Sequence, residues 1–333
     1  MTTFGLKAEC GRFIQYDDAH CDLPALLRKG VFDGKFMHLG GGSNLLFTTG
    51  HYDGTVLHNA SAEYSFSEDR ATGDVLLKAD AGCVLDELCR ISCEHSLWGL
   101  ENLSGIPGQL GGAAVQNVGA YGMELKDVAV SVEIFDILSG EFRTIPGEEC
   151  DYGYRNSMFK HLDIPGSMIV TRMEIRFTKV TSARLGYAAL KQKFGETPTE
   201  NLTPMMLREA IMKLRDEKLP DPSVTGSAGS FFMNPIVSRE QHAAMQRKHG
   251  MEIPGHATAS DSIKLSAAWL IDHSGCKPLT FGGAALWQKQ PLVLVNATGY
   301  ATGMDVVNLE RAIQHRVHEQ FGVWLTPETV HID

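Results

Sequence analysis

The sequence of 333 residues predicts an α+β fold, because strands and helices occur in mixed order without a regular βαβ alternation. Segments 128–136 and 141–146 are expected strands joined by the short turn 138–140, which is typical of a hairpin, and the expected strand 168–177 alternates in polarity. Helical periodicity is confined to separated segments, of which 201–218 is the clearest. The glycines of segment 37–47 lack the spacing of a dinucleotide-binding fingerprint, and no clear helix follows them. A doubly wound parallel sheet is therefore disfavoured.

The expected elements are short in the first part of the chain and longer later. Before residue 100 we expect helices at 23–28 and 84–95 and strands at 36–39, 54–59 and 74–79. Beyond residue 120 we expect strands at 128–136, 141–146, 168–177 and 291–296, helices at 201–218, 266–273 and 304–321, and a closing strand near Trp324 and the C-terminus. The helix at 201–218 carries an apolar stripe that includes Leu202, Met206 and Leu214.

A domain boundary is expected after that helix, where residues 219–222 read Leu-Pro-Asp-Pro. A chain of this length has a prior of roughly two to three domains. We therefore expect three lobes, at 1–67, 68–219 and 220–333.

Charge and composition exclude several classes of partner. The net charge is −10, from 30 basic and 40 acidic residues, so the basic face that nucleic acid or a membrane surface requires is not expected. The N-terminal segment lacks the apolar core of a signal peptide, and no stretch is long and apolar enough for a transmembrane helix. The seven cysteines are odd in number and lack metal-ligand spacing, which indicates free thiols. We therefore expect a cytoplasmic protein without a metal site.

The most distinctive segment is 103–122, which contains six glycines and no charged residue. Glycine lets the backbone approach a ligand closely and adopt positive φ, and successive backbone N–H groups form concavities that hold anions. Ser104, Gln116, Asn117 and Tyr121 add side-chain donors and acceptors. The segment therefore indicates a cradle for a large phosphate-containing cofactor, and a glycine-rich surface loop is the alternative.

A second glycine-rich segment supports the cofactor interpretation. Residues 37–47 place three glycines and a Ser-Asn pair between apolar flanks, which is typical of a strand, a phosphate-binding turn and a second strand. No Gly-x-x-x-x-Gly-Lys-Ser/Thr pattern occurs, so a P-loop is excluded. Two separated glycine cradles suit one long cofactor that spans two lobes better than they suit a single dinucleotide-binding unit.

Three shorter sites carry residue types suited to catalysis. Arg155 lies among tyrosines in segment 151–157, where its planar guanidinium could clamp a carboxylate; a surface arginine stacked on an aromatic ring is the alternative. Ser230 lies in a run of small residues before Phe231-Phe232, where it could approach a ligand or simply form a turn. Glu328 follows a proline near the expected closing strand, and most such carboxylates are solvated. None of the three sites identifies a reaction alone.

Together these segments resemble those of the UDP-N-acetylenolpyruvoylglucosamine reductases, along essentially the whole chain. The similarity is carried by the glycine segments 40–46 and 104–122, a Tyr-Arg-x-Ser-x-Phe-Lys motif at 154–160, a Gly-Ser-Phe-Phe-x-Asn-Pro loop at 229–235, the block 264–277 and Leu-x-Pro-Glu at 325–328. The motifs follow one another in the order typical of the family. Pro278 replaces a usual glycine and Met233 a commoner lysine, and neither change touches an expected catalytic residue.

The resemblance implies an FAD-binding fold of two α+β lobes followed by a C-terminal α+β substrate-binding domain. It also implies bound FAD, NADPH as co-substrate and a UDP-sugar substrate, in a monomer that takes part in peptidoglycan precursor synthesis. The residues that it assigns to FAD binding lie in the two glycine segments: Gly40, Gly41, Gly42, Ser43, Asn44, Leu45, Ser104, Gly105, Ile106, Gly111, Gln116, Asn117, Gly119 and Ala120.

The reaction that the resemblance implies is the NADPH-dependent reduction of UDP-N-acetylglucosamine enolpyruvate to UDP-N-acetylmuramate. Hydride passes from FAD N5 to the enolpyruvyl methylene carbon, and Ser230 donates a proton to the neighbouring carbon. Arg155 and Glu328 act at the substrate carboxylate, where negative charge grows. The implied substrate-binding residues are Tyr121, Tyr187, Lys218, Asn234, Lys264 and Lys277.

The insertion at 184–187 and the run at 218–222 resemble the type I members of the family. In that type a tyrosine loop closes over the substrate. By this resemblance Tyr187 supplies the tyrosine and Lys218 faces the UDP diphosphate.

Two other functions are compatible with the glycine cradles. One is a flavin oxidase or dehydrogenase with another substrate, and the motifs around Ser230 and Glu328 argue against it. The other is a flavin- or UDP-sugar-binding sensor without turnover, and the intact Arg155, Ser230 and Glu328 argue against that.

Overall fold

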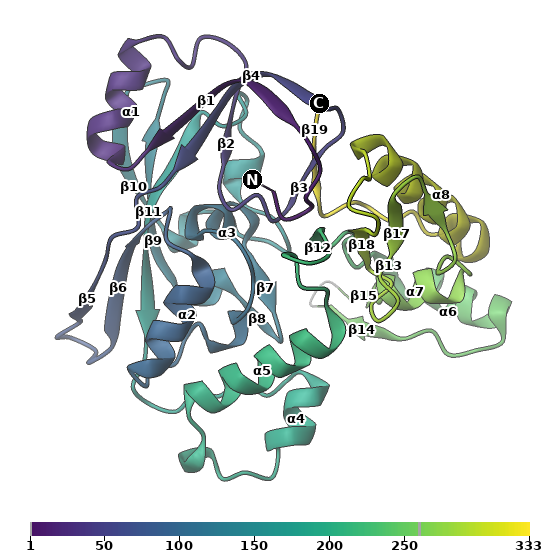
Figure 1. Ribbon diagram of the computed structural model, residues 1–333. Coiled ribbons are helices and arrows are strands. Elements are labelled where there is room, and N and C mark those ends of the chain that lie inside the picture. The colour runs from purple at the N-terminus through teal and green to yellow at the C-terminus, as the bar shows by residue number, and fades with distance from the viewer. Residues whose placement is uncertain (1, 259–260) are drawn as a thin grey trace. The chain divides into compact units, whose positions relative to one another are not determined.

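The computed structural model describes residues 2–258 and 261–333 and divides into two compact units (Figure 1). Unit 1 consists of Met1–Glu9, Gly42–Tyr52 and Lys218–Asp333. Unit 2 consists of Cys10–Gly41 and Asp53–Glu217. The short segment 42–52 thus belongs with the C-terminal part of the chain, and the division into three lobes at 67 and 219 stays a prediction.

The main sheet of unit 2 has five antiparallel strands in the order β10-β9-β11-β6-β5. Their bounds are β5 Tyr64–Glu68, β6 Val75–Asp80, β9 Ala129–Asp136, β10 Glu141–Pro146 and β11 Met168–Phe177. The expected hairpin is confirmed, because Glu141 pairs with Asp136 and Gly140 turns the chain at a φ of 72°. Alternate residues of β11 are buried, which is the period of two that its sequence predicts.

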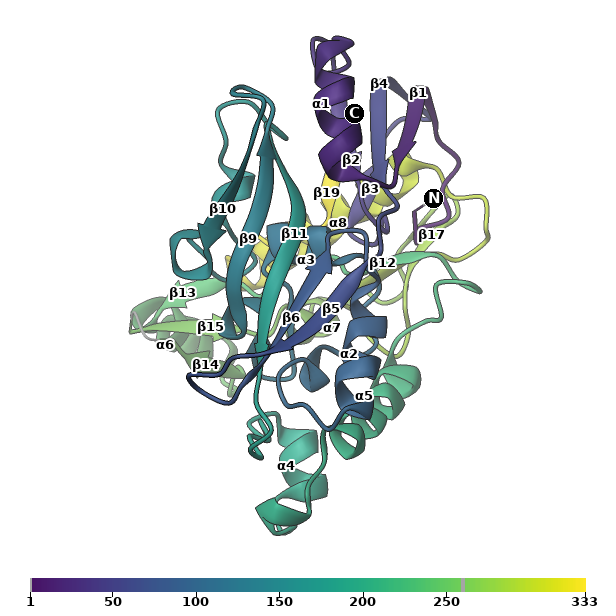
Figure 2. The same cartoon turned by 90° about the vertical axis from the view of Figure 1, so that its left-hand side faces the viewer.

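Two helices bury their apolar faces against this sheet, which faces the viewer in Figure 2 with α3 behind it. They are α2 Leu85–Glu94 and α3 Leu110–Gln116. Leu88 of α2 and Leu110 of α3 belong to one hydrophobic cluster with Leu77 and Ile175 of the sheet. This cluster holds the glycine-rich segment against the strands.

A smaller sheet of three strands has the order β1-β4-β2, in which β2 runs parallel to β4. Its strands are β1 Glu9–Tyr16, β2 Phe36–Leu39 and β4 His51–Asn59. The helix α1 Ala19–Arg28 begins after Asp18, whose carboxylate accepts a hydrogen bond from the Cys21 N–H (3.0 Å). Leu23 of this helix packs with Leu57 and Phe135, which joins this layer to the main sheet.

The helices α4 Ala188–Phe194 and α5 Pro204–Lys218 pack on each other through one turn of each helix. Leu190 and Phe194 of α4 meet Leu207 and Ile211 of α5 around the buried Trp98. The helix predicted at 201–218 is thereby confirmed, although it begins at a proline, which is favoured at the first helical position.

Unit 1 contains two sheets, with the orders β12-β18-β17-β16 and β13-β15-β14, and a parallel pair of β3 with β19. The strands are β3 Leu45–Phe47, β12 Ser227–Ser230, β13 Ile236–Ser238, β14 Gly255–Ala257, β15 Ser262–Leu265, β16 Thr280–Phe281, β17 Ala284–Leu286, β18 Val293–Asn296 and β19 Val330–Ile332. The helices are α6 Arg239–His249, α7 Ala267–His273 and α8 Gly303–Phe321. Each begins after a hydroxyl residue whose side chain accepts a backbone N–H: Ser238, Ser266 and Thr302.

The predicted mixture of strands and helices is confirmed, but several elements were not expected, among them β1, β5, α4 and α6. The reason is clearest for α6, which buries only Met245 and therefore has no apolar stripe to detect. The expected closing strand is confirmed near the C-terminus as β19, although it begins at Val330, and Trp324 precedes it in an irregular segment.

No helix within the described ranges is both long enough and apolar enough to cross a bilayer. The seven cysteines are free thiols, and five of them are buried: Cys83, Cys89, Cys93, Cys150 and Cys276.

The strand β19 is tied to α8 by His331, whose Nε2 lies 2.7 Å from a carboxylate oxygen of the buried Glu310. The hydrogen bond to Glu310 raises the pKa of His331 above its usual value of about 6.5. A raised folded-state pKa means that the pair stabilises fully below the unfolded-state pKa and less as pH rises through the folded-state value. We therefore expect His331→Gln to lower the free energy of unfolding more at about pH 5.5 than at about pH 8.5. Urea unfolding at both pH values measures this, and an equal loss at both would contradict it.

Candidate functional site

The glycine-rich segment 103–122 is not one continuous turn. Residues 110–116 form the helix α3, and Gly119 and Ala120 form the short strand β7, which pairs with β8 Met123–Glu124. A helix, which was not expected, therefore interrupts the predicted cradle of backbone amides. The helix was detectable, because Leu110, Ala113 and Ala114 recur at helical spacing and are the residues that it buries.

The two glycine-rich segments approach each other within unit 2. A Cβ on Gly41 would lie 2.7 Å from the Cα of Gly108, and a Cβ on Gly40 would lie 3.3 Å from Oε1 of Gln109. Only glycine allows backbones this close. The structure therefore brings together parts of the two predicted cradles.

Asn59, at the end of β4, adds a polar group that the sequence interpretation missed. Its backbone oxygen accepts a hydrogen bond from Nε2 of Gln109 (3.0 Å), and its Oδ1 accepts from the N–H of Ser61 (2.9 Å). Its buried Nδ2 has no hydrogen-bond partner among the described residues. A buried amide donor without a partner is costly, so the residues beside this cradle fit a ligand rich in acceptor oxygens, such as the phosphates of FAD.

A packing test of the cradle follows from Gly41. We expect Gly41→Ala to lower the free energy of unfolding by roughly 1–3 kcal/mol, because the new methyl group must displace the backbone of Gly108. Gly112→Ala is the matched control, since a Cβ there meets nothing within 4 Å and alanine favours the helix. Denaturant unfolding measures both variants. Equal stability of the two would contradict the close approach.

Arg155 lies in a tight turn beside the end of α3. Its backbone is left-handed at a φ of 54°, its Nη2 donates to the carbonyl of Gly119 (2.7 Å), and its guanidinium lies 5.3 Å from the ring centre of Tyr154. Lys160 donates to both the backbone oxygen of Arg155 (3.0 Å) and Oε1 of Gln116 (3.0 Å). The stacked arginine that sequence offered as an alternative is therefore observed, and it lies against a residue predicted to bind FAD.

Asn117 ends α3 with a left-handed backbone at a φ of 46°. Its side chain is fully buried: Nδ2 donates to the carbonyl of Gly153 (2.8 Å), and Oδ1 accepts from the N–H of Lys126 (3.0 Å). Ser157 Oγ donates to the carbonyl of Val115 (2.6 Å). These bonds dock the turn that carries Arg155 on the end of the glycine-rich segment.

Ser230 is the last residue of β12, and its side chain is exposed. Gly229 before it has a φ of 69°, and the pairing of β12 with β18 is irregular between Ser227 and Ser230. Phe231 after it is fully buried and donates its N–H to the carbonyl of Leu292 (2.8 Å). The serine is thus held at the edge of a well-anchored strand.

Glu328 lies beside the segment of Ser230 in unit 1. Its N–H donates to the carbonyl of Phe231 (2.8 Å), and its carbonyl accepts from Nδ2 of Asn44 (3.1 Å). The N–H of Val330 donates to the carbonyl of Asn44 (3.0 Å). Segments far apart in sequence, which carry Asn44, Ser230 and Glu328, therefore meet in one backbone ladder.

The predicted substrate tyrosines meet within unit 2. The rings of Tyr121 and Tyr187 pack edge to face at 4.9 Å, and Tyr187 directly precedes α4. Asn102 Nδ2 donates to the carbonyls of Tyr121 (2.8 Å) and Arg184 (3.1 Å), which joins the two segments. Burial raises the pKa of Tyr121.

The other predicted substrate residues lie in unit 1. Lys218 ends α5 exposed, and its carbonyl accepts from Nε1 of Trp287 (3.0 Å). Asn234 Oδ1 accepts the N–H of Ala267 (2.9 Å) at the start of α7, and Lys264 lies on β15. Lys277 pairs with Asp272 (2.5 Å). Arg155, Tyr121 and Tyr187 thus belong to one unit, and Ser230, Glu328 and the remaining substrate residues to the other.

The remaining residues predicted for FAD differ in their accessibility. Ser104 is fully buried and donates Oγ to the carbonyl of Glu101 (2.7 Å), and the N–H of Gly105 donates to Asp86 (2.6 Å). A Cβ on Gly111 would lie 2.8 Å from the Cβ of Ala81. Gly42 has a φ of 62°, Leu45 begins β3, and Ser43, Ile106 and Ala120 are half-buried.

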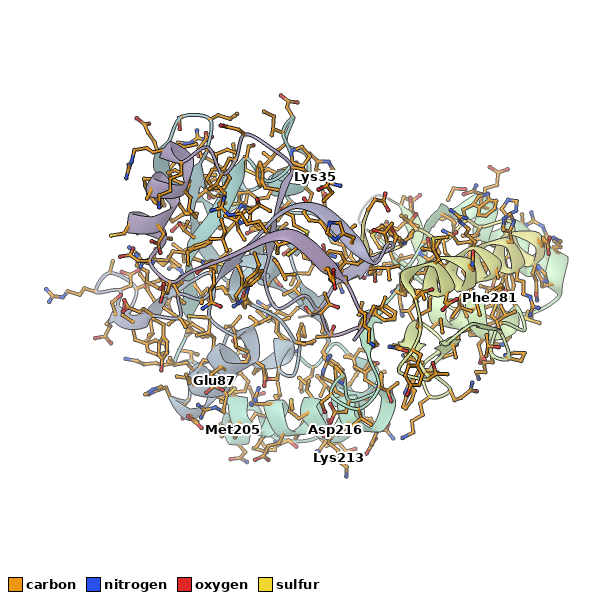
Figure 3. The ribbon with its side chains drawn as sticks, turned by 45° about the horizontal axis from the view of Figure 1, so that its top comes forward. Lys35, Glu87, Met205, Lys213, Asp216 and Phe281 are labelled. Atoms are coloured by element: carbon orange, nitrogen blue, oxygen red, sulfur yellow. The ribbon has the colours of Figure 1, made fainter. Side chains whose placement is uncertain are left out.

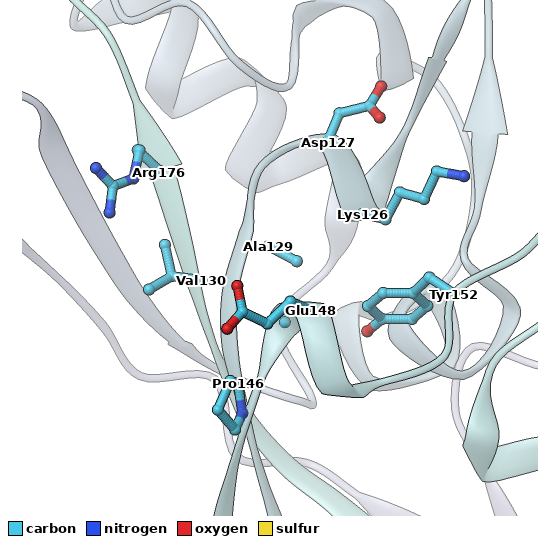
Figure 4. A pocket seen from close by; sticks show the side chains of 9 residues that line it. Lys126, Asp127, Ala129, Val130, Pro146, Glu148, Tyr152 and Arg176 are labelled. Atoms are coloured by element: carbon cyan, nitrogen blue, oxygen red, sulfur yellow. The ribbon is translucent and has the colours of Figure 1, made fainter.

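Two surface pockets of unit 2 are lined by none of the predicted site residues. The larger, of about 660 Å³, is lined by charged and polar groups that include Lys126, Asp127, Glu148, Tyr152 and Arg176 (Figure 4). The smaller, of about 200 Å³, lies around Asp80, Glu133 and Arg172. Within residues 2–258 and 261–333, no three His, Cys, Asp or Glu side chains are grouped as a metal site.

Two family models match this chain. The C-terminal domain of UDP-N-acetylenolpyruvoylglucosamine reductase matches residues 221–332, and the FAD binding domain matches residues 27–145. The second match contains both glycine-rich segments, and the first contains Ser230 and Glu328.

Similar proteins cover nearly the whole chain. A UDP-N-acetylenolpyruvoylglucosamine reductase of Bacteroides fragilis is 39% identical, over 98% of this chain and 96% of that protein. One of Chromobacterium violaceum is 40% identical, over 98% of this chain and 94% of that protein. The crystal structure of the reductase from Thermus caldophilus has the same fold, with a TM-score of 0.66 at 24% identity, over 100% of this chain and 96% of that chain. This chain belongs to the UDP-N-acetylenolpyruvoylglucosamine reductase family and is an FAD-binding oxidoreductase of peptidoglycan precursor synthesis.

Proposed function

We propose that this chain reduces UDP-N-acetylglucosamine enolpyruvate to UDP-N-acetylmuramate with NADPH as the reductant. The observation that carries the proposal is the ladder of unit 1, in which the N–H of Glu328 donates to the carbonyl next to Ser230. A proton donor and a carboxylate are thereby held on adjacent segments. Such a pair suits a reaction that builds negative charge and then protonates carbon.

Bound FAD would supply the hydride chemistry, which no side chain can provide. Gly40, Gly41 and the glycines of 105–119 would line its site, because a glycine backbone can approach a ligand closely. The amide of Asn59 would donate to an acceptor oxygen of the cofactor.

The side chains would act on the enolpyruvyl group. Hydride addition at the methylene carbon leaves negative charge on the neighbouring carbon and its carboxylate. Arg155 would hold that carboxylate with a charged, planar donor fork. Glu328 would assist at the same group, and Ser230 would donate a proton from Oγ to the carbon.

Substrate recognition would use the residues that the family resemblance assigns to it. Tyr121 and Tyr187 would contact the substrate as in the type I members of the family, an assignment that the insertion at 184–187 and the packing of the two rings support. Lys218 would face the UDP diphosphate, and the residues that would complete the set are Asn234, Lys264 and Lys277. We further propose that the protein acts as a cytoplasmic monomer.

An anaerobic visible spectrum tests the proposed function. We expect a flavin band that bleaches with NADPH and returns only after UDP-N-acetylglucosamine enolpyruvate is added. A band that bleaches but does not return with this substrate would favour an oxidoreductase with another oxidising substrate. A band that NADPH does not bleach would favour a binding protein without turnover. No flavin band after FAD is supplied would contradict the cofactor assignment.

A further inference from the structure

An ion pair between two helices of unit 2 lies outside the residues assigned to catalysis or binding. The helices α2 and α5 lie side by side in both views (Figures 1 and 2). Arg208 of α5 donates through Nη1 to Oδ1 of Asp86 (2.5 Å) and through Nη2 to Oδ2 (3.0 Å). Arg208 is 9% exposed. A two-pronged hydrogen bond of this kind fixes both side chains in one geometry.

The same carboxylate also binds the predicted cofactor segment. The N–H of Gly105 donates to Oδ1 of Asp86 (2.6 Å), and the backbone of Gly105 is in the left-handed region at a φ of 75°. Asp86 therefore joins the turn 104–106 to α5 through Arg208. Because this N–H already donates to Asp86, Gly105 contributes to the cradle through its backbone conformation.

The face of α5 that carries Arg208 also covers this turn. A Cβ on Gly105 would lie 2.8 Å from Nε of Arg215 and 2.8 Å from Sδ of Met212. Arg208, Met212 and Arg215 follow one another at spacings of four and three residues, so they lie on one side of the helix. The turn is thus held from one side by a carboxylate and enclosed from the other by α5.

The charges of the pair persist at neutral pH. Burial opposes ionisation of Asp86, but hydrogen bonds from Arg208 and Gly105 outweigh it and lower the pKa of Asp86. The hydrogen bond to Asp86 likewise raises the pKa of Arg208. Removing Asp86 would leave the buried guanidinium of Arg208 without this partner, which is the costly way to break such a pair, whereas the Asp86 side chain is 29% exposed.

We infer that Asp86 and Arg208 are positioning residues that hold the turn 104–106 in the shape that binds FAD. The inference rests on the proposed assignment of this turn to FAD. The pair acts through Gly105, not by touching the cofactor. Loss of the ion pair should therefore raise the Kd for FAD by more than any loss of folding stability would explain.

The test compares FAD binding by three variants and a matched control. The variants are Asp86→Asn, Arg208→Met and Arg208→Lys. The control is Glu87→Gln, which removes the neighbouring carboxylate on α2, an exposed partner of Arg90 (2.6 Å); Glu87 is labelled in Figure 3. The readouts are the Kd of the apoprotein for FAD, from quenching of flavin fluorescence, the visible spectrum of the bound flavin, and thermal unfolding of the apoprotein.

We expect Asp86→Asn and Arg208→Met to raise the Kd for FAD by about 10-fold or more, since each loses a charge-assisted hydrogen bond. Arg208→Lys should lie between them and the wild type, because lysine keeps the charge but not the fork. The control should stay within about twofold of the wild type, as exposed pairs contribute little.

The outcomes separate this inference from the proposed function. Variants that unfold earlier but bind FAD with the Kd and spectrum of the control would overturn the positioning role. If Arg208→Lys binds FAD as weakly as Arg208→Met does, the charge of Arg208 has no part in the positioning role. If Asp86→Asn does not fold, the two Arg208 variants decide the question alone. Wild-type protein that takes up no FAD would overturn the assignment on which the inference rests.

Discussion

Replacing Ser230 by alanine is expected to lower turnover by about 10²–10⁴-fold, the usual contribution of a positioned proton donor. Reduction of the flavin by NADPH should be unchanged, because that step needs no proton from Ser230. The substitution should not disturb the fold, because Ser230 is exposed at the end of β12 and the buried Phe231 anchors the strand.

Anaerobic stopped-flow measurement of each half-reaction distinguishes the two steps. Bleaching by NADPH should keep its wild-type rate in Ser230→Ala, and the return of the flavin band with the enolpyruvyl substrate should be slow. Ser227→Ala is the matched control, since it also replaces a serine by alanine, three residues earlier on the same strand. Near-wild-type turnover in Ser230→Ala would remove Ser230 from the role of proton donor.

Replacing Arg155 by methionine is expected to lower kcat by about 10²–10³-fold, which is the usual cost of one donor to a developing negative charge. Methionine keeps much of the length of the side chain but cannot bind a carboxylate. Arg155→Lys should retain part of the activity, because a lysine supplies the charge as a single point without the planar fork. A loss in kcat together with kcat/KM would indicate an interaction made in the transition state.

Arg155 also has a structural contact, so the variants need a control for folding. Its Nη2 donates to the carbonyl of Gly119, and its loss could disturb the turn beside α3. The visible spectrum and the FAD content of Arg155→Met should therefore match the wild type. Arg143→Met serves as the comparison, since it removes a half-exposed arginine that pairs with Asp136 (2.9 Å) in the same unit. Wild-type kcat in Arg155→Met would contradict the proposed role.

Local sequence patterns predicted the elements that have strong periodicity. The hairpin of β9 and β10 and the helices α5 and α8 were expected close to where they lie, because their apolar residues repeat at a period of two or about 3.6. The helix α6 was missed because it buries a single methionine, and α3 was missed because its glycines outweighed its buried alanines in our interpretation.

The residues of the candidate site also fall into those that local sequence patterns predicted and those that only the structure revealed. Ser230, Glu328 and Arg155 were expected from short motifs, since each motif is contiguous in the chain. Asn59 and Asp86 were not expected, because neither residue type is unusual in its own segment. Their importance arises from partners about 50 and 120 residues away, Gln109 and Arg208.

The sequence by itself determined the α+β class, the two glycine-rich segments and the motifs that place this chain in its family. Those features depend on residue type and spacing along the chain. Only the tertiary structure decided that Gly41 and Gly108 touch, that Glu328 pairs with the segment of Ser230 through the backbone, and that Asp86 holds Gly105. Such contacts join residues far apart in sequence through backbone groups that every residue carries, so no local pattern can specify them.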